Sequence, residues 1–242
     1  MKSIFPILSA GGPLLFRQLF ETVSCTYTYL LADSVTKNAV IIDPVLEKVE
    51  RDANLITDLG LKLGPIIDTH LHADHVTGSG QLKKRFPGSY SVIGDYKKVI
   101  ADQKVKHGDR IRFGNFEIEC RSTPGHTSSC LTLVMHKVGA IFTGDTLFVR
   151  GCGRTDFPGS SAEQLHDSVH AHIFSLPDEY LVFPGHDYAG FLYTTVGEEK
   201  MYNPRLRKSK EEFIEIMKNL KLDLPKQIKR ASQLNPVGGI EN

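Results

Sequence analysis

Three histidines and an aspartate lie within six positions of the chain: His70, His72, Asp74 and His75. They follow an apolar run over residues 64–68, which is typical of a buried strand. Side chains alternate along a strand, so His70 and His72 would point to the same side as the strand ends. The alternative, a solvated loop rich in histidine, does not account for this spacing directly after an apolar strand. Imidazole and carboxylate groups gathered in this way predict a metal site.

Three later stretches also place a histidine or an aspartate just after a predicted strand, namely His126, Asp145 and His186. A glycine stands directly before each of them, where it allows the backbone to turn sharply. Taken singly, each would more often be a packing or turn residue. Four strand ends with the same chemistry instead indicate loops that converge at one edge of a sheet structure. The predicted ligand set therefore has seven members: His70, His72, Asp74, His75, His126, Asp145 and His186.

The elements that must position these residues are strands in neighbouring pairs, with helices between them. Residues 16–32 and 38–44 have the pattern of a hairpin, and Gly114-Asn115 marks a second one. Helical spacing follows over 46–59, and again over 161–174. Strands and helices do not alternate strictly, so we predict an α+β fold in which two sheets pack face to face with helices outside.

The rest of the chain gives weaker signals. We expect a short helix over residues 96–101, an amphipathic helix around 213–220, and an irregular tail after Pro225. The expected division is an N-terminal extension of unknown role over 1–15, a main domain over 16–200, and a C-terminal helix with its tail over 201–242, packed on the same domain.

Composition excludes several function classes. The chain has 242 residues, of which 40% are hydrophobic and 24% charged, as in ordinary globular proteins. Its net charge of +1 gives no support for a nucleic acid or an anionic membrane as partner. The basic runs at 83–85 and 205–210 are interpreted as solvated faces. Four cysteines without CxxC spacing favour a reducing compartment over secretion.

A family resemblance rests on the ordered motifs His-x-His-x-Asp-His at 70–75, Gly-His-Thr at 125–127, Gly-Asp-Thr at 144–146 and Gly-His at 185–186. Together they resemble the signature of the metallo-β-lactamase superfamily. The resemblance implies an αβ/βα sandwich of two mixed β-sheets, with helices on the outside and metal at one edge. Within that superfamily, residues 147–157 are similar to the persulfide dioxygenase family, as are later motifs at 186–188, 194–199 and 203–206. The tail from Ala231 departs from that family, because it lacks the expected cysteine.

The finer resemblance implies one Fe(II) per chain, held by His70, His126 and Asp145. Two histidines and one carboxylate form a facial triad with open coordination positions. The other four residues of the set would orient ligands and water around the iron: His72, Asp74, His75 and His186. Such an enzyme oxidises glutathione persulfide with O₂ to sulfite and glutathione, in sulfide detoxification. No catalytic residue beyond the ligands and these neighbours is implied.

The resemblance also bears on substrate binding and location. It implies that Arg154 helps to place glutathione persulfide through a bidentate pair with a carboxylate, although an ion pair with Asp156 is the alternative. Tyr188 is expected to line the pocket, or else only to pack beside it. The family's usual location is the mitochondrion, with the cytoplasm as the alternative, and a homodimer is compatible with it.

The same seven residues permit a second chemistry. A dinuclear hydrolase of the glyoxalase II type would hold one metal with His70, His72 and His126. The second metal would bind Asp74, His75 and His186, with Asp145 as the bridge and a hydroxide that attacks a thioester. The short stretch after His186 argues against this class, because glyoxalase II enzymes carry a longer helical region there. A non-enzymatic or RNA-processing role is disfavoured by the intact ligand set and the lack of a basic surface. A catalytic thiol at Cys152 is unnecessary for metal chemistry.

Overall fold

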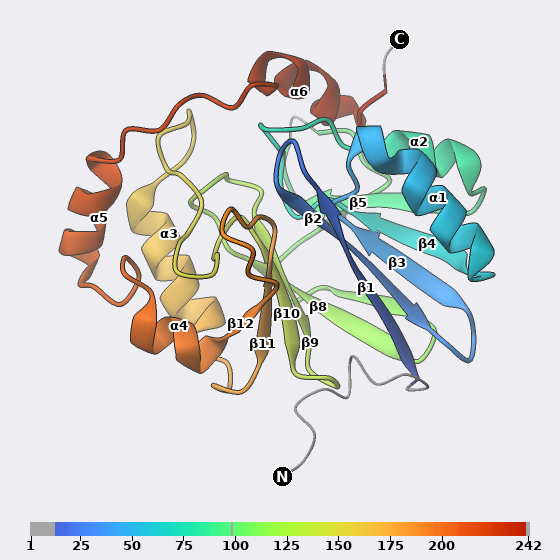
Figure 1. Cartoon of the computed structure of the whole chain (residues 1–242), viewed down its shortest axis with the longest axis horizontal. Helices are drawn as coiled ribbons and strands as arrows, with labels where there is room; N and C mark the ends of the chain where they lie inside the picture. The colour runs from blue at the N-terminus through green and yellow to red at the C-terminus, as the bar shows by residue number, and fades with distance from the viewer. Residues whose placement is uncertain (1–12, 98, 241–242) are drawn as a thin grey trace.

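A computed structural model describes residues 13–97 and 99–240. Two six-stranded sheets face each other, and helices cover their outer sides (Figure 1). The strand order is β1-β2-β3-β4-β5-β6 in the first sheet and β12-β11-β10-β9-β8-β7 in the second. Each sheet mixes antiparallel and parallel pairs, because β3 to β6 run parallel in the first sheet and β10 pairs in parallel with β11 in the second. The predicted α+β sandwich is confirmed.

The first sheet carries two helices on its outer face. Its strands are β1 (Leu14–Glu21), β2 (Thr26–Asp33), β3 (Asn38–Ile42), β4 (Lys62–Ile67), β5 (Tyr90–Gly94) and β6 (Gln103–Val105). The turn η1 (Leu46–Lys48) leads into α1 (Val49–Asp58), and α2 (Ser79–Arg85) follows the loop of clustered histidines. Apolar residues of α1 and α2, such as Ile56 and Leu82, pack against the outer side chains of β2 to β4. The first hairpin and the helix before His70 therefore form as predicted.

The second sheet is covered by the later helices. Its strands are β7 (Arg110–Phe113), β8 (Phe116–Ser122), β9 (Leu131–Met135), β10 (Ala140–Gly144), β11 (Leu181–Pro184) and β12 (Thr194–Thr195). Its helices are α3 (Ala162–Ser168), the π-helix η2 (Val169–Ile173), α4 (Val196–Tyr202) and α5 (Lys210–Lys218). Phe213 and Met217 of α5 join the apolar cluster that α3 forms against this sheet. The predicted amphipathic helix is therefore anchored on the sandwich.

Aromatic side chains fill the space between the sheets. Phe16 and Phe183 have ring centroids 4.9 Å apart, and so have Tyr29 and Phe142. Tyr29, Phe142 and Phe183 are fully buried, and each such side chain stabilises the fold by roughly 1.5–3 kcal/mol. This core holds the ends of the strands, and hence the loops after them, in fixed relative positions.

Two predictions about local structure are wrong. The described residues of 96–101 form no helix, and the amide of Ile100 donates instead to the carbonyl of Pro236, 2.8 Å away. The tail is not irregular either, because it contains α6 (Ile228–Leu234) and η3 (Asn235–Val237). Ala231 of α6 is buried, so this helix packs on the sandwich. In Figure 1 the chain crosses above the strand ends from α5 to reach α6. Residues 1–12 of the predicted N-terminal extension lie outside the described residues, and the division into domains stays a prediction.

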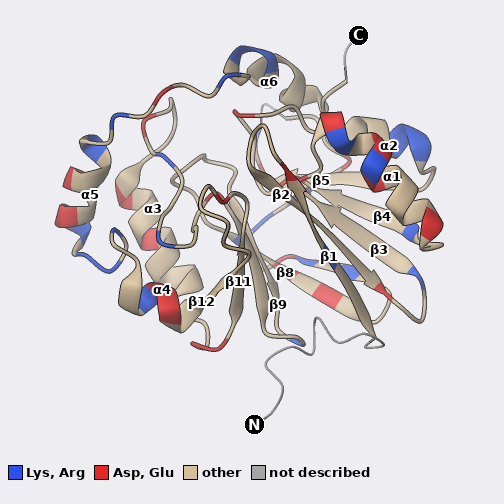
Figure 2. Ribbon diagram, viewed as in Figure 1, with Lys and Arg blue, Asp and Glu red and all other residues tan. Residues whose placement is uncertain are grey.

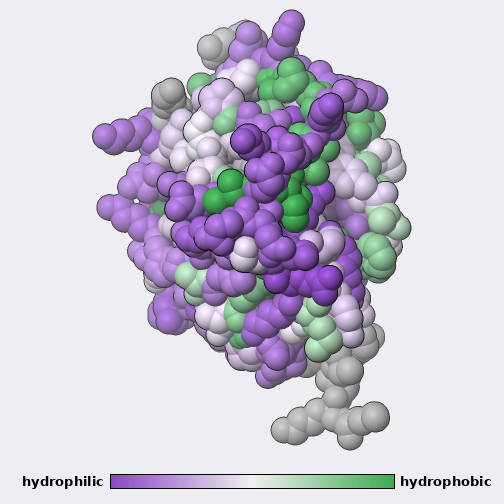
Figure 3. All heavy atoms as spheres, turned by 90° about the vertical axis from the view of Figure 1, so that its left-hand side faces the viewer, coloured by the Kyte–Doolittle hydropathy of each residue, from purple (hydrophilic) through white to green (hydrophobic). Residues whose placement is uncertain are grey.

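The surface has no dominant charge in the views shown. Figure 2 shows Lys and Arg intermixed with Asp and Glu along the helices. The face on the left of Figure 1 is mostly hydrophilic, with apolar side chains gathered near its centre (Figure 3). Within the part of the chain that the structure describes, no helix has the length and apolar character needed to cross a membrane.

Candidate metal centre

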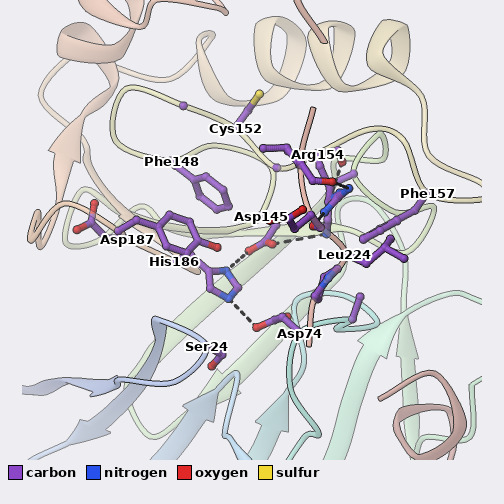
Figure 4. Close-up of a pocket in the computed structure, with 18 of the residues that line it drawn as sticks. Ser24, Asp74, Asp145, Phe148, Cys152, Arg154, Phe157, His186, Asp187 and Leu224 are labelled. Carbon is purple, nitrogen blue, oxygen red and sulfur yellow. Dashed lines mark hydrogen bonds and ion pairs between the residues drawn. The ribbon is translucent and has the colours of Figure 1, made fainter. Parts of the chain in front are cut away.

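All seven predicted ligands come together at one edge of the sandwich. They lie in the loops that follow β4, β8, β10 and β11. His70 and His72 have ring centroids 4.1 Å apart, and the ring of His126 lies 5.0 Å from that of His70. Asp145 and His186 are hydrogen-bonded to each other, and His186 also reaches Asp74 (Figure 4). The loops of both sheets therefore converge as the strand-end pattern predicts.

His70, His126 and Asp145 form one compact group. Oδ2 of Asp145 lies 3.5 Å from Nε2 of His126 and 3.8 Å from Nε2 of His70. All three residues are buried, and one ligand atom from each lies within 4.8 Å of the other two. A second group with the same spacing consists of His72, Asp74 and His75. Both groups have the donor types that bind divalent transition metals.

Hydrogen bonds determine which nitrogen each of the first two histidines presents. Nδ1 of His126 lies 2.8 Å from the carbonyl oxygen of Arg154, which only accepts, so Nδ1 carries the proton and Nε2 has a free lone pair. Nδ1 of His70 lies 3.0 Å from Oγ1 of Thr69. That hydroxyl gives its own proton to Asp43, so it accepts from His70 and leaves Nε2 of His70 free.

Several imidazole nitrogens are buried without a partner. Within residues 13–97 and 99–240, Nε2 of His70, Nδ1 of His72 and Nε2 of His75 accept and donate no hydrogen bond. A buried polar atom without a partner destabilises a fold, and native structures contain few of them. Of these three atoms, Nε2 of His70 lies 3.8 Å from Oδ2 of Asp145 and is accounted for by a metal that the site binds. The donor set therefore fits a divalent metal ion.

Asp43 orients His72 directly and His70 through Thr69. Its backbone is left-handed, with φ of 50°, and its carboxylate accepts from the amide and hydroxyl of Thr69 at 2.7 and 2.8 Å. It also pairs with Nε2 of His72 at 3.1 Å. Burial lowers the pKa of His72, but Asp43 outweighs burial and raises that pKa to about 9. Sequence analysis identified Asp43 only as the end of a strand before Pro44.

His186 joins the two carboxylates of the site. Its Nδ1 lies 2.7 Å from Asp145 and its Nε2 lies 2.9 Å from Asp74. Burial opposes the charged form, yet these carboxylates raise the pKa of His186 well above its usual range. Burial likewise pushes the pKa of Asp145 upward, and the neighbouring His186 and His70 reverse this and hold it well below the usual range. Both nitrogens of His186 are therefore engaged by carboxylates, and its contact with Oδ1 of Asp145 leaves Oδ2 facing His70 and His126.

A cavity of about 580 Å³ opens above these residues. Asp74, Asp145 and His186 lie at its base, and Phe148, Phe157 and Leu224 are among the apolar residues around it (Figure 4). The volume is that of a site for a small organic ligand. Residues 222–227, which include the start of the tail that sequence analysis expected to be irregular, form one of its walls.

Arg154 and Tyr188 both line this cavity, as expected. The guanidinium of Arg154 pairs bidentately with Asp156 at 2.6 and 2.7 Å and donates to the carbonyl of Asp223 at 2.6 Å. The alternative ion pair is thus present, and the contact of Arg154 with substrate stays a prediction. The ring of Tyr188 is parallel to that of His186, with centroids 6.1 Å apart, and its side chain is largely exposed.

Arg205 is a cavity residue that sequence analysis missed. It was interpreted as part of a solvated basic run, but it is half-buried in the cavity wall. Arg150 pairs with Glu198 and Glu199, whereas Arg205 has no carboxylate partner within the described residues. Its Nη1 lies 4.0 Å from the sulfur of Cys152. Burial raises the pKa of Cys152 to about 11, so this thiol is not a nucleophile at neutral pH.

Comparisons with known proteins agree with this geometry. The model of the metallo-beta-lactamase superfamily matches residues 25–186, which defines the class of protein. The persulfide dioxygenase ETHE1, mitochondrial, of Homo sapiens is 51% identical over 96% of this chain and 91% of its own length. The crystal structure of ETHE1 from Myxococcus xanthus has 47% identity and a TM-score of 0.90, covering 93% of this chain and all of that one. The chain belongs to the metallo-β-lactamase superfamily and, within it, to the persulfide dioxygenase family.

A hydrolase is a more distant relative. The probable hydroxyacylglutathione hydrolase of Schizosaccharomyces pombe is 32% identical over 82% of this chain and 88% of its own length. The identity to the human dioxygenase is clearly higher and extends over more of the chain.

Proposed function

We propose that this protein is a persulfide dioxygenase that oxidises glutathione persulfide with O₂. In the balanced reaction, glutathione persulfide, O₂ and water give glutathione, sulfite and two protons. The observation that carries the proposal is the group of His70, His126 and Asp145, in which Nε2 of each histidine faces the same carboxylate oxygen and Nε2 of His70 is buried without a partner in the described residues. The identity to dioxygenases over nearly the whole chain supports the same activity.

The metal is proposed to be one Fe(II) per chain, held by His70, His126 and Asp145. When bound, this ion supplies electrons and open coordination positions for the persulfide sulfur and O₂. The protein itself orients the metal ligands and excludes water. Thr69 and the carbonyl of Arg154 set the protonation of the two histidines, and the apolar walls of the cavity keep bulk water from the reacting sulfur.

The neighbouring polar residues support one metal over two. A dinuclear centre would take His186 as a ligand, and here both of its nitrogens are paired with carboxylates. It would also take Asp145 as a bridge, and here one of the two oxygens of Asp145 is engaged by His186. We therefore propose that His72, Asp74, His75 and His186 surround a single iron and orient its ligands and water through hydrogen bonds.

The decisive experiment measures metal and oxygen together. Protein purified without O₂ is analysed for metals, and O₂ uptake and sulfite are followed after glutathione persulfide is added. We expect one iron per chain, with sulfite formed in a one-to-one ratio to the O₂ consumed. Two metal ions per chain, with cleavage of a glutathione thioester and no O₂ uptake, would establish the hydrolase instead.

Glutathione carries carboxylates, so the cavity needs cationic groups to bind it. Arg154 and Tyr188 remain our proposed contacts, and Arg205 adds a guanidinium without a carboxylate partner in the described residues. We expect Arg205→Ala to raise KM for glutathione persulfide about tenfold or more, because a hydrogen bond to a charged group contributes roughly 1.5–3 kcal/mol. The value of kcat should change little. Steady-state kinetics test this, with the exposed Arg207→Ala as the matched control. An unchanged KM would exclude Arg205 as a substrate contact.

The location and the oligomeric state are proposed from fewer observations than the activity. The mammalian relatives are named mitochondrial proteins, and we propose the same location for this chain. A homodimer stays a prediction. A molar mass in solution of twice the 26.9 kDa of one chain would support it.

A further inference from the structure

The C-terminal segment reaches the loop of clustered histidines through one side chain. Asn235 is 4% exposed. Its Nδ2 donates to the carbonyl oxygens of His72 and His75, at 2.8 and 2.9 Å. Its Oδ1 accepts from the amide of Thr77 at 2.9 Å. The carboxamide therefore uses three of its four hydrogen-bonding positions on a loop about 160 residues earlier in the chain.

These three backbone groups depend on Asn235 for their hydrogen bonds. The loop belongs to no helix or strand, and residues 72, 75 and 77 are all buried. Within the described residues, no other hydrogen bond reaches these two carbonyls and this amide. Without the carboxamide, the loop would have to rotate its peptide groups to find new partners. Such a rotation would move the side chains of His72, Asp74 and His75, which the same backbone carries.

Other residues of the tail also make close contacts beside Asn235. The amide of Gly80 donates to the carbonyl of Gly238 at 2.9 Å. Gly239 has a left-handed backbone, with φ of 74°, and a Cβ atom at this position would lie 2.0 Å from the carbonyl oxygen of Thr77. Only glycine permits this close approach, so the contact between the tail and the loop depends on the glycine at position 239.

We propose that Asn235 is a positioning residue of the metal centre, which sets the metal affinity through the backbone of the loop over residues 72–77. In the described residues, its side-chain hydrogen bonds go to backbone groups of this loop. It lies beyond residue 186, where the match to the superfamily model ends, so a part of the chain outside that match completes the centre. The proposal rests on the proposed function only in requiring that a metal binds here.

The test compares metal affinities of Asn235→Ala and Asn235→Asp with that of the unaltered protein. The aspartate keeps an acceptor for the amide of Thr77 and loses both donations to the carbonyls. The dissociation constant for Fe(II) is measured without O₂ by competition with a chelator. Thermal unfolding of the metal-free proteins is measured in parallel. We expect both variants to bind iron about tenfold more weakly, which is the lower end of the loss seen when a group bonded directly to a ligand is removed, because Asn235 acts one step further from the metal.

Asn203→Asp is the matched control. Asn203 is also buried, and its carboxamide also makes hydrogen bonds to backbone groups, but on Gly151, Arg205 and Leu206, and it donates as well to the carboxylate of Glu199. This variant should lower the unfolding temperature and leave the iron affinity within about threefold of the unaltered value. A third variant, Gly239→Ala, crowds the carbonyl of Thr77 with Asn235 intact, and it should weaken iron binding as the Asn235 variants do.

Unaltered iron affinity in Asn235→Asp, with an unfolding temperature lowered as in Asn203→Asp, would overturn the proposal and leave Asn235 a purely structural residue. If Asn235→Ala fails to fold, Asn235→Asp and Gly239→Ala decide the question. A failure of the proposed function would give a different result. Iron-loaded protein without O₂ uptake would refute the dioxygenase activity, and the comparison of iron affinities would remain valid.

Discussion

Replacing His126 with alanine is expected to abolish both iron binding and persulfide oxidation. His126 is one of the two histidines whose Nε2 faces Asp145, and no other imidazole in the described residues takes the same position opposite that carboxylate oxygen as His126 and His70 do. A bound metal contributes several kcal/mol to transition-state stabilisation, so the rate should fall at least about a thousandfold. Iron per chain and sulfite formation, measured on the same preparation, check this expectation.

The control for this variant is His136→Ala, which removes a histidine that is largely exposed and bonded to Glu119 far from the metal centre. It should retain iron and activity. If His126→Ala kept one iron per chain and oxidised persulfide at a comparable rate, the assignment of the ligand set would be wrong.

Asp43→Asn is expected to weaken iron binding and to destabilise the fold together. The carboxylate accepts three hydrogen bonds, from the amide and hydroxyl of Thr69 and from His72. Asparagine has the same shape but offers one oxygen, and its NH₂ group would face a donor. Breaking a buried pair of this kind costs about 3–5 kcal/mol of unfolding free energy. His70 and His72 would lose their orientation, which should reduce the iron affinity about 10–100-fold.

Urea unfolding of the metal-free protein and chelator competition measure the two effects separately. Asp58→Asn, at an exposed position of α1, is the matched control and should change neither. A variant at Asp43 that lost stability but bound iron normally would show that Asp43 only supports the fold.

The ligand set could be predicted because each of its members follows a strand, and strand ends are readable from local patterns. The positions of Asp43, Arg205 and Asn235 could not be predicted in the same way. Asn235 meets the loop of His72 and His75 only after the chain has crossed the strand ends, some 160 residues later. Nothing in its local sequence indicates this contact. The described residues of 96–101 form no helix for a similar reason, because the amide of Ile100 bonds to the carbonyl of Pro236 in the tail.

The pairing of Arg154 also depended on tertiary structure. Its neighbour Asp156 was visible in the sequence, but the carbonyls of Leu222 and Asp223 that complete its hydrogen bonds come from a distant segment. Sequence patterns thus identified the candidate metal ligands that the fold brings together, and tertiary contacts determined which other groups hold them in place.

Arg154 serves the site twice, through two different parts of the residue. Its carbonyl oxygen orients His126, while its side chain fastens the wall formed by residues 222–227. A backbone carbonyl is present whatever side chain occupies the position. Mutations at residue 154 can therefore remodel the pocket without removing the backbone contact that orients His126, a proposed metal ligand. The wall of the pocket and the orientation of this histidine can thus be altered separately.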